Sequence, residues 1–318
     1  MTETNKHLSP ENTQNTHAPN KKRNKPPLDP YTAALKKRAY RIRKIITMVF
    51  IGIFVFICLV LLVFAALGWR FVRRPIIDPA TGTRGFVQFV GRMNRDGDLT
   101  TGTLFFPDNS RAIVTLLDNG MQQAVFPNGN VFVGEMMNLQ KHGQGRLELG
   151  NGDVFEGQFM NNVFHGQGRY YFRNGDFFEG NFENGMKSGE GIYIWAEING
   201  RSPRFEGNFE NGMRNGHGVF YFDDGSRYEG NFVNDVKHDY NAYLQIRREV
   251  DGEIVIDVFR GAFYNNMRHG YGVYTWGDSG EVFRGYFYRN RIHGQGTYFW
   301  LSGRTFTGEF RNGQMVLD

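Results

Sequence analysis

The nine residues Phe-Glu-Gly-Asn-Phe-Glu-Asn-Gly-Met occur twice, unchanged, at 178–186 and 205–213. Their core, aromatic-x-Gly-x-aromatic, recurs along the chain, and from Gly134 onward its central glycines follow one another at steps of 23, 23, 27, 23, 31, 24 and 23 residues. A near-constant period of this length is typical of chains that stack one small unit many times. The strong copies are Phe155/Gly157/Phe159, Phe178/Gly180/Phe182, Phe205/Gly207/Phe209, Tyr228/Gly230/Phe232, Phe259/Gly261/Phe263, Phe283/Gly285/Phe287 and Phe306/Gly308/Phe310, and weaker ones are Phe132/Gly134/Met136, Phe89/Gly91/Met93 and Ile113/Thr115/Leu117.

Each copy continues into a second half with the spacing Gly-x-Gly-x-aromatic-x-aromatic, as in "HGQGTYFW" at 293–300, which contains Gly294 and Gly296. Alternation with period two, broken by Asn-Gly turns such as Asn184-Gly185 and Asn211-Gly212, predicts β-hairpins. Residues i, i+2 and i+4 of a strand share a face. We therefore expect one face of rings and glycines, with a ring of one repeat over the bare glycine backbone of the next. This face would hold Phe178, Gly180 and Phe182, and likewise Phe205, Gly207 and Phe209.

The pattern resembles that of MORN (membrane occupation and recognition nexus) repeats, whose unit carries Tyr/Phe-Glu-Gly-x-Phe followed by Gly-x-x-x-Gly-x-Gly. Residues 153–236 and 259–313 match it well, 131–152 fairly and 86–130 poorly, so we assign degenerate repeats to 86–130 and the MORN repeat domain to 131–318. The resemblance implies an all-β fold, an elongated single-layer antiparallel sheet of stacked hairpins. About twenty strands at ~4.8 Å spacing would make it roughly 95 Å long.

Two segments depart from the repeat. In 238–261 the residues Tyr240 and Ala242 replace the paired glycines and the hairpin is longer, and in 196–204 a longer loop intervenes. Insertions in repeat proteins often lie on the binding face. Tolerated loop variation explains them equally well.

The N-terminal third has a different composition. Residues 1–28 are polar and predict a disordered basic tail. Asp29-Pro30 suits the start of a helix over 29–68, and the 23 uncharged residues 45–67 are long enough to span a membrane. A buried core helix and a cleaved signal peptide are the alternatives. We expect a linker over 69–85.

Charge separates the two parts of the chain. Residues 1–44 carry 11 Lys/Arg and 3 Asp/Glu, a net of +8, and residues 68–318 carry 26 and 29, a net of −3. The large domain therefore lacks the positive surface of a nucleic-acid-binding protein. The basic flank favours a cytoplasmic N-terminus and an extracytoplasmic repeat domain, periplasmic in a bacterium. The one cysteine, Cys58, excludes an intrachain disulfide.

Candidate chemistry is sparse in the repeats. Equivalent histidines one repeat apart would stand about 10 Å from each other, whereas a zinc ion needs its ligands within about 2.3 Å. Equivalent glutamates share one environment, whereas catalytic carboxylate pairs need different ones. Some MORN proteins carry a fused catalytic domain, but the repeats here run to 311–313 and leave no room for one. We expect no catalytic, cofactor-binding or metal-binding residues and no enzyme activity. The histidines are His142, His165, His269 and His293, with His217 shifted by two.

Together these features predict a non-enzymatic, single-pass, membrane-anchored scaffold or tether that binds a protein partner or a second copy of itself, and no nucleic acid. The alternative is a ligand-binding module for lipid headgroups or for a cell-wall polysaccharide. Our candidate interaction surface combines the repeated acidic positions with the departing hairpin. Its residues are Glu156, Glu179, Glu206, Glu229, Tyr240, Tyr243, Arg247 and Arg248.

Overall fold

The computed structural model describes residues 29–77, 84–95, 97–198 and 200–317, and the chain divides into two compact units, Met1–Val63 and Phe64–Asp318. The basic tail predicted at 1–28 lies outside the described residues.

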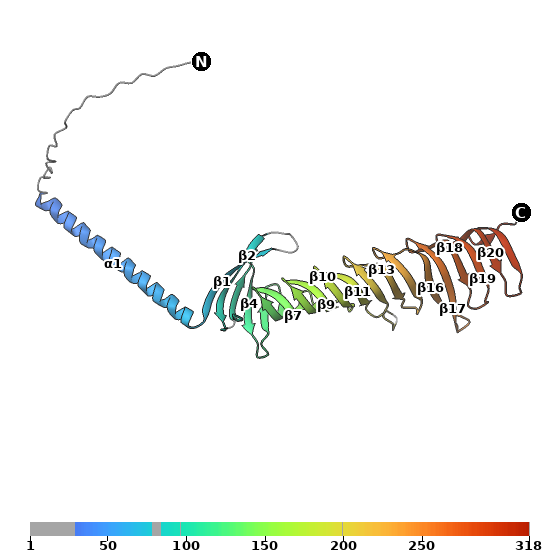
Figure 1. Cartoon of the computed structure of the whole chain (residues 1–318), viewed down its shortest axis with the longest axis horizontal. Coiled ribbons are helices and arrows are strands. Elements are labelled where there is room, and N and C mark those ends of the chain that lie inside the picture. The colour runs from blue at the N-terminus through green and yellow to red at the C-terminus, as the bar shows by residue number, and fades with distance from the viewer. Residues whose placement is uncertain (1–28, 78–83, 96, 199, 318) are drawn as a thin grey trace, which may run out of the picture. The chain divides into compact units, whose positions relative to one another are not determined.

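Helix α1 (Pro30–Ala66) begins where the sequence predicts (Figure 1). The Asp29 carboxylate accepts hydrogen bonds from the backbone N–H groups of Tyr31 (2.9 Å) and Thr32 (3.0 Å), which is N-cap geometry, and Pro30 takes the first helical position. The helix is 37 residues long, none of them buried, and its apolar part is long enough to cross a membrane. A signal sequence passes the same test of length and composition.

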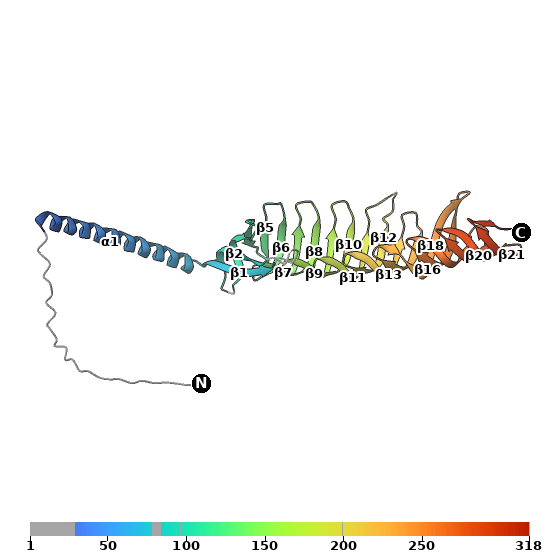
Figure 2. The same ribbon diagram turned by 90° about the horizontal axis from the view of Figure 1, so that it is seen from above.

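The rest of the described chain forms one antiparallel sheet of 22 strands, as the sequence predicts (Figures 1 and 2). Each strand pairs with the next along the chain except β15, since β14 pairs with both the two-residue β15 and with β16. The strands are β1 (Trp69–Ile77), β2 (Arg84–Met93), β3 (Leu99–Phe105), β4 (Arg111–Leu116), β5 (Gln122–Val125), β6 (Val131–Met137), β7 (Gln140–Glu148), β8 (Val154–Met160), β9 (Val163–Tyr171), β10 (Phe177–Glu183), β11 (Met186–Ile194), β12 (Arg204–Glu210), β13 (Met213–Tyr221), β14 (Arg227–Val233), β15 (Val236–Lys237), β16 (Asp239–Val250), β17 (Glu253–Tyr264), β18 (Met267–Thr275), β19 (Val282–Tyr288), β20 (Arg291–Phe299), β21 (Thr305–Arg311) and β22 (Gln314–Met315).

The ring of each repeat is buried over the glycine pair of its own hairpin. Gly180 on β10 and Gly191 on β11 lie opposite each other, and a Cβ on either would come within 2.7 Å of the Phe178 ring. The prediction that a ring covers the glycines of the next repeat is therefore wrong. Neighbouring repeats meet instead through edge-to-face rings, with 5.1 Å between the centroids of Phe178 and Phe209. Such pairs add about 0.5–1.5 kcal/mol beyond the burial itself.

We call the side of the sheet that carries these rings the ring face, and the opposite side the outer face. Phe178 and Phe182 are both buried, as are Phe205 and Phe209, so the predicted sharing of one face is confirmed. The fully buried rings of the ring face include those of Phe155, Phe178, Phe205, Tyr228, Phe259 and Phe283.

The two glycines of Gly-x-Gly have different tasks. In β20 the first, Gly294, has φ +90° and lies where the pairing with β19 shifts by a β-bulge. This left-handed conformation favours glycine. At the second, Gly296, a Cβ would come within 2.5 Å of the Phe283 ring. One glycine therefore permits the bulge and the other makes room for the ring.

The turn prediction is also confirmed. Asn184 and Gly185 have φ of +52° and +82°, and Asn211 and Gly212 have +52° and +83°. Positive φ at both central residues is the requirement of the tight hairpin turn that Asn-Gly favours.

The N-terminal end of the sheet differs from two expectations. Residues 69–77 belong to strand β1, which pairs with β2 from Trp69↔Arg92 to Ile77↔Arg84, and do not form a linker. Alternating side chains explain this, because Val72 and Ile76 pack against the core. The degenerate copy at Ile113 was assigned one residue out of register, since Ile113 is 62% exposed and its neighbours Ala112 and Val114 are buried.

Candidate functional site

A row of basic side chains crosses the ring face, one in each of several repeats. Lys187 stands three residues after Asn184, and its Nζ lies 4.6 Å from the centroid of the Tyr193 ring and 5.3 Å from that of Phe209. Ammonium and guanidinium groups at this distance are attracted by the ring face. We call the set the cation row; it comprises Lys141, Lys187, Arg214, Lys237 and Arg268.

The cation row is largely without carboxylate partners. Arg214 pairs with Asp235 at 2.8 Å, whereas the other four members form no ion pair among the described residues. Desolvation without a nearby counter-charge lowers the pKa of Lys141 to about 8, and desolvation together with Arg214 does the same for Lys237. Half-buried, unneutralised charges of this kind mark sites that an anionic group could neutralise.

A hollow in the ring face adjoins the row. Its volume is about 270 Å³, and Lys187 lies in its wall together with rings from β9 and β10. These include Phe164, Tyr170 and Phe178. The ring face thus offers apolar contact area and positive charge side by side.

The four glutamates of the predicted surface lie on the outer face, where each pairs with an arginine. The distances are 2.8 Å for Arg146–Glu156, 2.8 Å for Arg169–Glu179, 2.7 Å for Arg204–Glu206 and 2.6 Å for Arg227–Glu229. Exposed pairs of this kind contribute about 0–1 kcal/mol each. The row is therefore a neutralised part of the surface.

Tyr240 and Tyr243 also lie on the outer face, and Tyr243 stands opposite Glu229 in the pairing of β16 with β14. Tyr240 is 86% exposed and borders a hollow of about 510 Å³, and Tyr243 borders an adjoining hollow of about 380 Å³ together with Glu229. Arg260 lines both hollows. The structure thus brings Glu229 and Tyr243 together and places Tyr240 at the adjoining hollow.

Arg247 and Arg248 are not part of that group. Arg248 donates hydrogen bonds of 2.7 and 2.8 Å to both carboxylate oxygens of Asp257, which is 1% exposed, and it lies 3.3 Å from Asp278. These interactions raise the pKa of Arg248. The backbone N–H of Arg247 donates a hydrogen bond of 3.0 Å to the Ser226 hydroxyl. Both residues hold the long hairpin β16–β17 against its neighbours.

Asp257 belongs to a set that the sequence analysis missed. Its carboxylate accepts hydrogen bonds from the Tyr274 hydroxyl (2.5 Å) and the Gly277 N–H (2.9 Å) of the next hairpin. Asp176 accepts the equivalent bonds from Tyr193 and Ala196, and Asp153 those from Tyr170 and Arg173. An acidic residue two positions before the buried ring, with a tyrosine 17 residues later, was the available signal.

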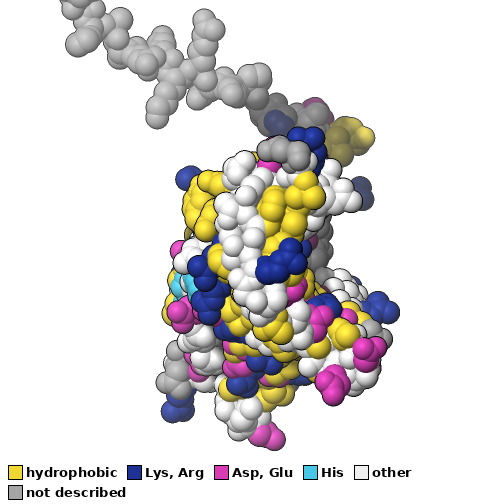
Figure 3. Space-filling view, turned by 90° about the vertical axis from the view of Figure 1, so that its right-hand side faces the viewer, with side chains coloured by type: hydrophobic (Ala, Val, Ile, Leu, Met, Phe, Trp, Pro, Cys, Tyr) yellow, Lys and Arg dark blue, Asp and Glu magenta, His cyan; other side chains and the backbone are white. Residues whose placement is uncertain are grey.

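The repeated histidines do not converge. Within the described residues, no three His, Cys, Asp or Glu side chains are close enough together to hold a metal ion. His269 packs instead between Tyr264 and Tyr288, with ring centroids 5.8 and 5.1 Å away. On the surface seen from the C-terminal end, histidine lies beside basic side chains at the left-hand edge (Figure 3).

The geometry of stacked hairpins agrees with the similarity to known proteins. The MORN repeat family matches residues 132–154, 155–177, 178–197, 205–227, 228–238, 259–281, 283–303 and 306–316. The chain is a MORN-repeat protein. The expected family membership is thereby confirmed, and MORN-repeat proteins are in general binding or scaffold proteins. Strands β2 and β3, outside the matched residues, repeat the geometry, because a Cβ on Gly91 or Gly102 would meet the Phe89 ring.

No curated protein matches the chain. Among solved structures, the wild-type TCP10 domain of Danio rerio CPAP, in complex with a peptide of Danio rerio STIL, is 12% identical. The alignment covers 75% of this MORN-repeat chain and 100% of the TCP10 chain, with a TM-score of 0.32.

Proposed function

We propose that this MORN-repeat protein is a non-enzymatic scaffold, anchored in a membrane by α1, that binds an extended segment of a partner protein on its ring face. The cation row is the observation that carries the proposal. Lys141, Lys187 and Lys237 are desolvated over aromatic rings and form no ion pair among the described residues. A partner with carboxylates would neutralise these three ammonium groups, which are poorly hydrated in the ring face.

The spacing of the row favours an extended chain as the ligand. Equivalent side chains of adjacent repeats are two strands apart, roughly 10 Å. Three residues of an extended peptide also cover roughly 10 Å. A segment with an acidic residue at every third position would therefore meet a cation in most successive repeats; the repeat of β9 has Phe164 at this position. The residues between the acidic ones would contact the partly buried rings, such as Tyr170 and Tyr193.

The topology belongs to the same proposal. The basic flank of α1, with Lys36, Lys37, Arg38, Arg41, Arg43 and Lys44, supports a cytoplasmic N-terminus and an extracytoplasmic sheet. Labelling of single introduced cysteines in intact cells tests it, in a Cys58→Ser background. A cysteine in the sheet should react with a membrane-impermeant reagent, and one before α1 should not. The reverse result would place the partner on the other side of the membrane.

A synthetic peptide tests the ring-face site directly. We expect the full chain in detergent to bind a peptide with aspartate at every third position, and binding to fall at least tenfold in Lys141→Gln/Lys187→Gln/Lys237→Gln. Arg260→Gln/Arg284→Gln, which removes charge from the outer face, is the matched control and should bind normally. Fluorescence anisotropy measures both.

Two results would redirect the proposal. Equal binding of a peptide with the same composition in scrambled order would contradict the spacing argument. Vesicles with phosphatidylserine that bind through the same lysines, where the peptide does not, would favour the lipid-binding alternative.

A further inference from the structure

The outer face changes character along the sheet although the ring face does not. In β17–β19, four tyrosines are about half exposed at positions that hold polar residues or methionine in β8–β12. Exposed aromatic side chains grouped in one region mark interaction surfaces more often than chance exposure does. Tyr264 and Tyr288 align with Met160, Glu183 and Glu210. Tyr271 aligns with Gln167 and Glu190, and Tyr286 aligns with Gln158, Asn181 and Asn208.

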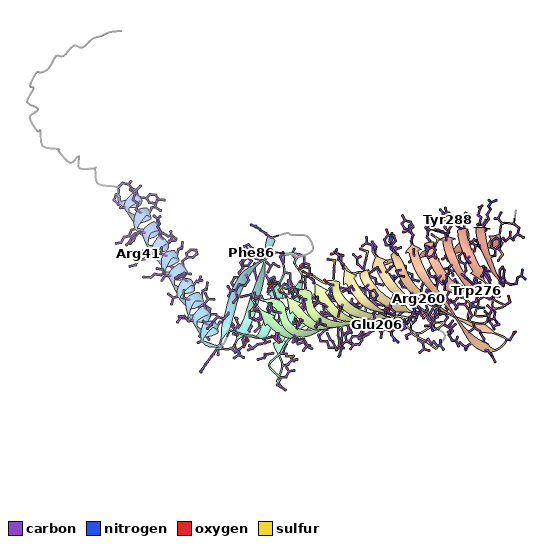
Figure 4. All side chains as sticks on the ribbon, turned by 45° about the vertical axis from the view of Figure 1, so that its right-hand side comes forward. Arg41, Phe86, Glu206, Arg260, Trp276 and Tyr288 are labelled. Atoms are coloured by element: carbon purple, nitrogen blue, oxygen red, sulfur yellow. The ribbon has the colours of Figure 1, made fainter. Side chains whose placement is uncertain are left out.

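The charge of the outer face also reverses. Arg260 and Arg284 occupy the position directly before the central glycine, where the preceding repeats hold Glu156, Glu179 and Glu206. Neither arginine forms an ion pair among the described residues; Arg260 lies 4.8 Å from the Tyr243 ring and Arg284 5.2 Å from the Phe299 ring. Glu206 and Arg260 mark the two regions in Figure 4.

The acidic region has unpaired charges of its own. Glu183, Glu190 and Glu210 lie on strands β10–β12, and none of them pairs with a basic side chain in the described part of the chain. The molecule therefore carries two regions of opposite charge on one face, each built on the same repeat. We call β8–β12 the acidic region and β16–β20 the tyrosine–arginine region.

We propose that the occupant of this face is a second copy of the chain, packed antiparallel so that the tyrosine–arginine region of each copy covers the acidic region of the other. A two-fold axis near β14 makes the two contacts identical. Because both regions repeat every two strands, roughly 10 Å apart, arginines and glutamates stay in step across the contact.

The chemistry and the size of the contact fit a stable interface. Tyrosine and arginine are the side chains enriched in interface cores. Tyr240 and Tyr271 border a hollow of about 510 Å³ that can receive side chains from the facing strands of the other copy. Five strands by seven residues give roughly 24 Å by 24 Å per contact, and two contacts bury roughly 2,300 Å² in total, above the range of standard-size interfaces.

This pairing uses the outer face and goes beyond the partner proposed for the ring face. Peptide binding at the cation row and pairing of two copies are separate measurements on separate residues, so either can fail alone.

Complementary charge reversal is the test, with the full chain in detergent micelles and sedimentation velocity as the readout. Wild type should contain two chains per particle. Arg260→Glu/Arg284→Glu should contain one, and so should Glu183→Arg/Glu210→Arg. An equimolar mixture of the two variants, with different tags, should again contain two, because both contacts of the mixed pair regain opposite charges. Glu249→Arg/Glu253→Arg, at the end of the long hairpin and outside the seven-residue width of the contact, is the control and should stay paired.

A wild type with one chain per particle would overturn the proposal, as would variants that stay paired or a mixture that stays separate. Circular dichroism checks that each variant keeps its sheet. Should a charge-reversed variant unfold, Tyr271→Ala/Tyr286→Ala decides: we expect its dissociation constant to rise at least tenfold, and an unchanged value rejects the pairing.

Discussion

The first half of the repeat sheet, β8–β13, and the second half, β16–β20, have the same core and different surfaces. Phe178 in the first half and Phe283 in the second are both fully buried over a glycine pair. On the outer face, the paired Glu179 of the first half gives way to the unpaired Arg284 of the second. The packing of stacked hairpins thus constrains every second residue of a strand, and the others are free to specify partners.

The largest expected effect tests whether the two cores are equivalent. Phe178→Ala and Phe283→Ala should each lower the free energy of unfolding by about 3–5 kcal/mol, because each removes a buried ring and leaves a cavity over two glycines. Denaturant unfolding gives the loss, and hydrogen exchange shows where the sheet opens. A loss below about 1 kcal/mol in one half alone would contradict the comparison.

The hydrogen bonds that Asp176 and Asp257 accept from the next hairpin should distinguish the two halves. Asp257→Asn should cost about 1.5–3 kcal/mol because it also loses Arg248, and Asp176→Asn, which loses no arginine, should cost less. Burial acts to raise the pKa of Asp257, but hydrogen bonds from Arg248, Gly277 and Tyr274 outweigh it and lower that pKa.

That direction sets the pH dependence. The unfolded carboxyl has a pKa of about 3.9, so the stabilising contribution of Asp257 is complete above it and is lost as the pH falls through the lower folded value. Melting temperatures of wild type and Asp257→Asn should therefore converge in acid. A constant difference between pH 7 and pH 2 would contradict this assignment.

The sequence predicted what is periodic and local. Asn184-Gly185 and the Asp29 cap could be read from neighbouring residues, and the buried position of Phe178 from the repeat. The side-chain partners of individual residues could not be predicted from neighbouring residues or from the repeat. Arg248 was assigned to the interaction surface because its binding to Asp257 depends on the register of β16 against β17. The sequence did not predict strand β1, because Arg74 stands between Val72 and Ile76 on the core-facing side and interrupts the alternating apolar pattern.

The cation row should give a smaller, pH-dependent effect on the stability of the sheet. Lys141 and Lys237 have folded pKa values of about 8, below the unfolded value of about 10.4. The unfolded chain therefore binds more protons between these values, and stability should rise by about 1–3 kcal/mol as the pH rises from 8 to 10.4. Lys141→Gln/Lys237→Gln should flatten the slope, and Lys36→Gln on α1 should not. An unchanged slope would show that these lysines are hydrated.

The smallest expected effect on stability concerns the tyrosines that distinguish the second half. Tyr271→Ala and Tyr286→Ala should each change the free energy of unfolding by less than about 0.5 kcal/mol in dilute chain, because both rings are about half exposed and lie on the face opposite to the buried rings. A loss above about 1 kcal/mol would mean that the tyrosines support the sheet. The outer face would then vary for reasons of packing, and its contrast with the first half would no longer indicate a partner. If the free energy of unfolding stays constant while self-association weakens, the ring face of each strand stabilises the sheet and the outer face binds the partner.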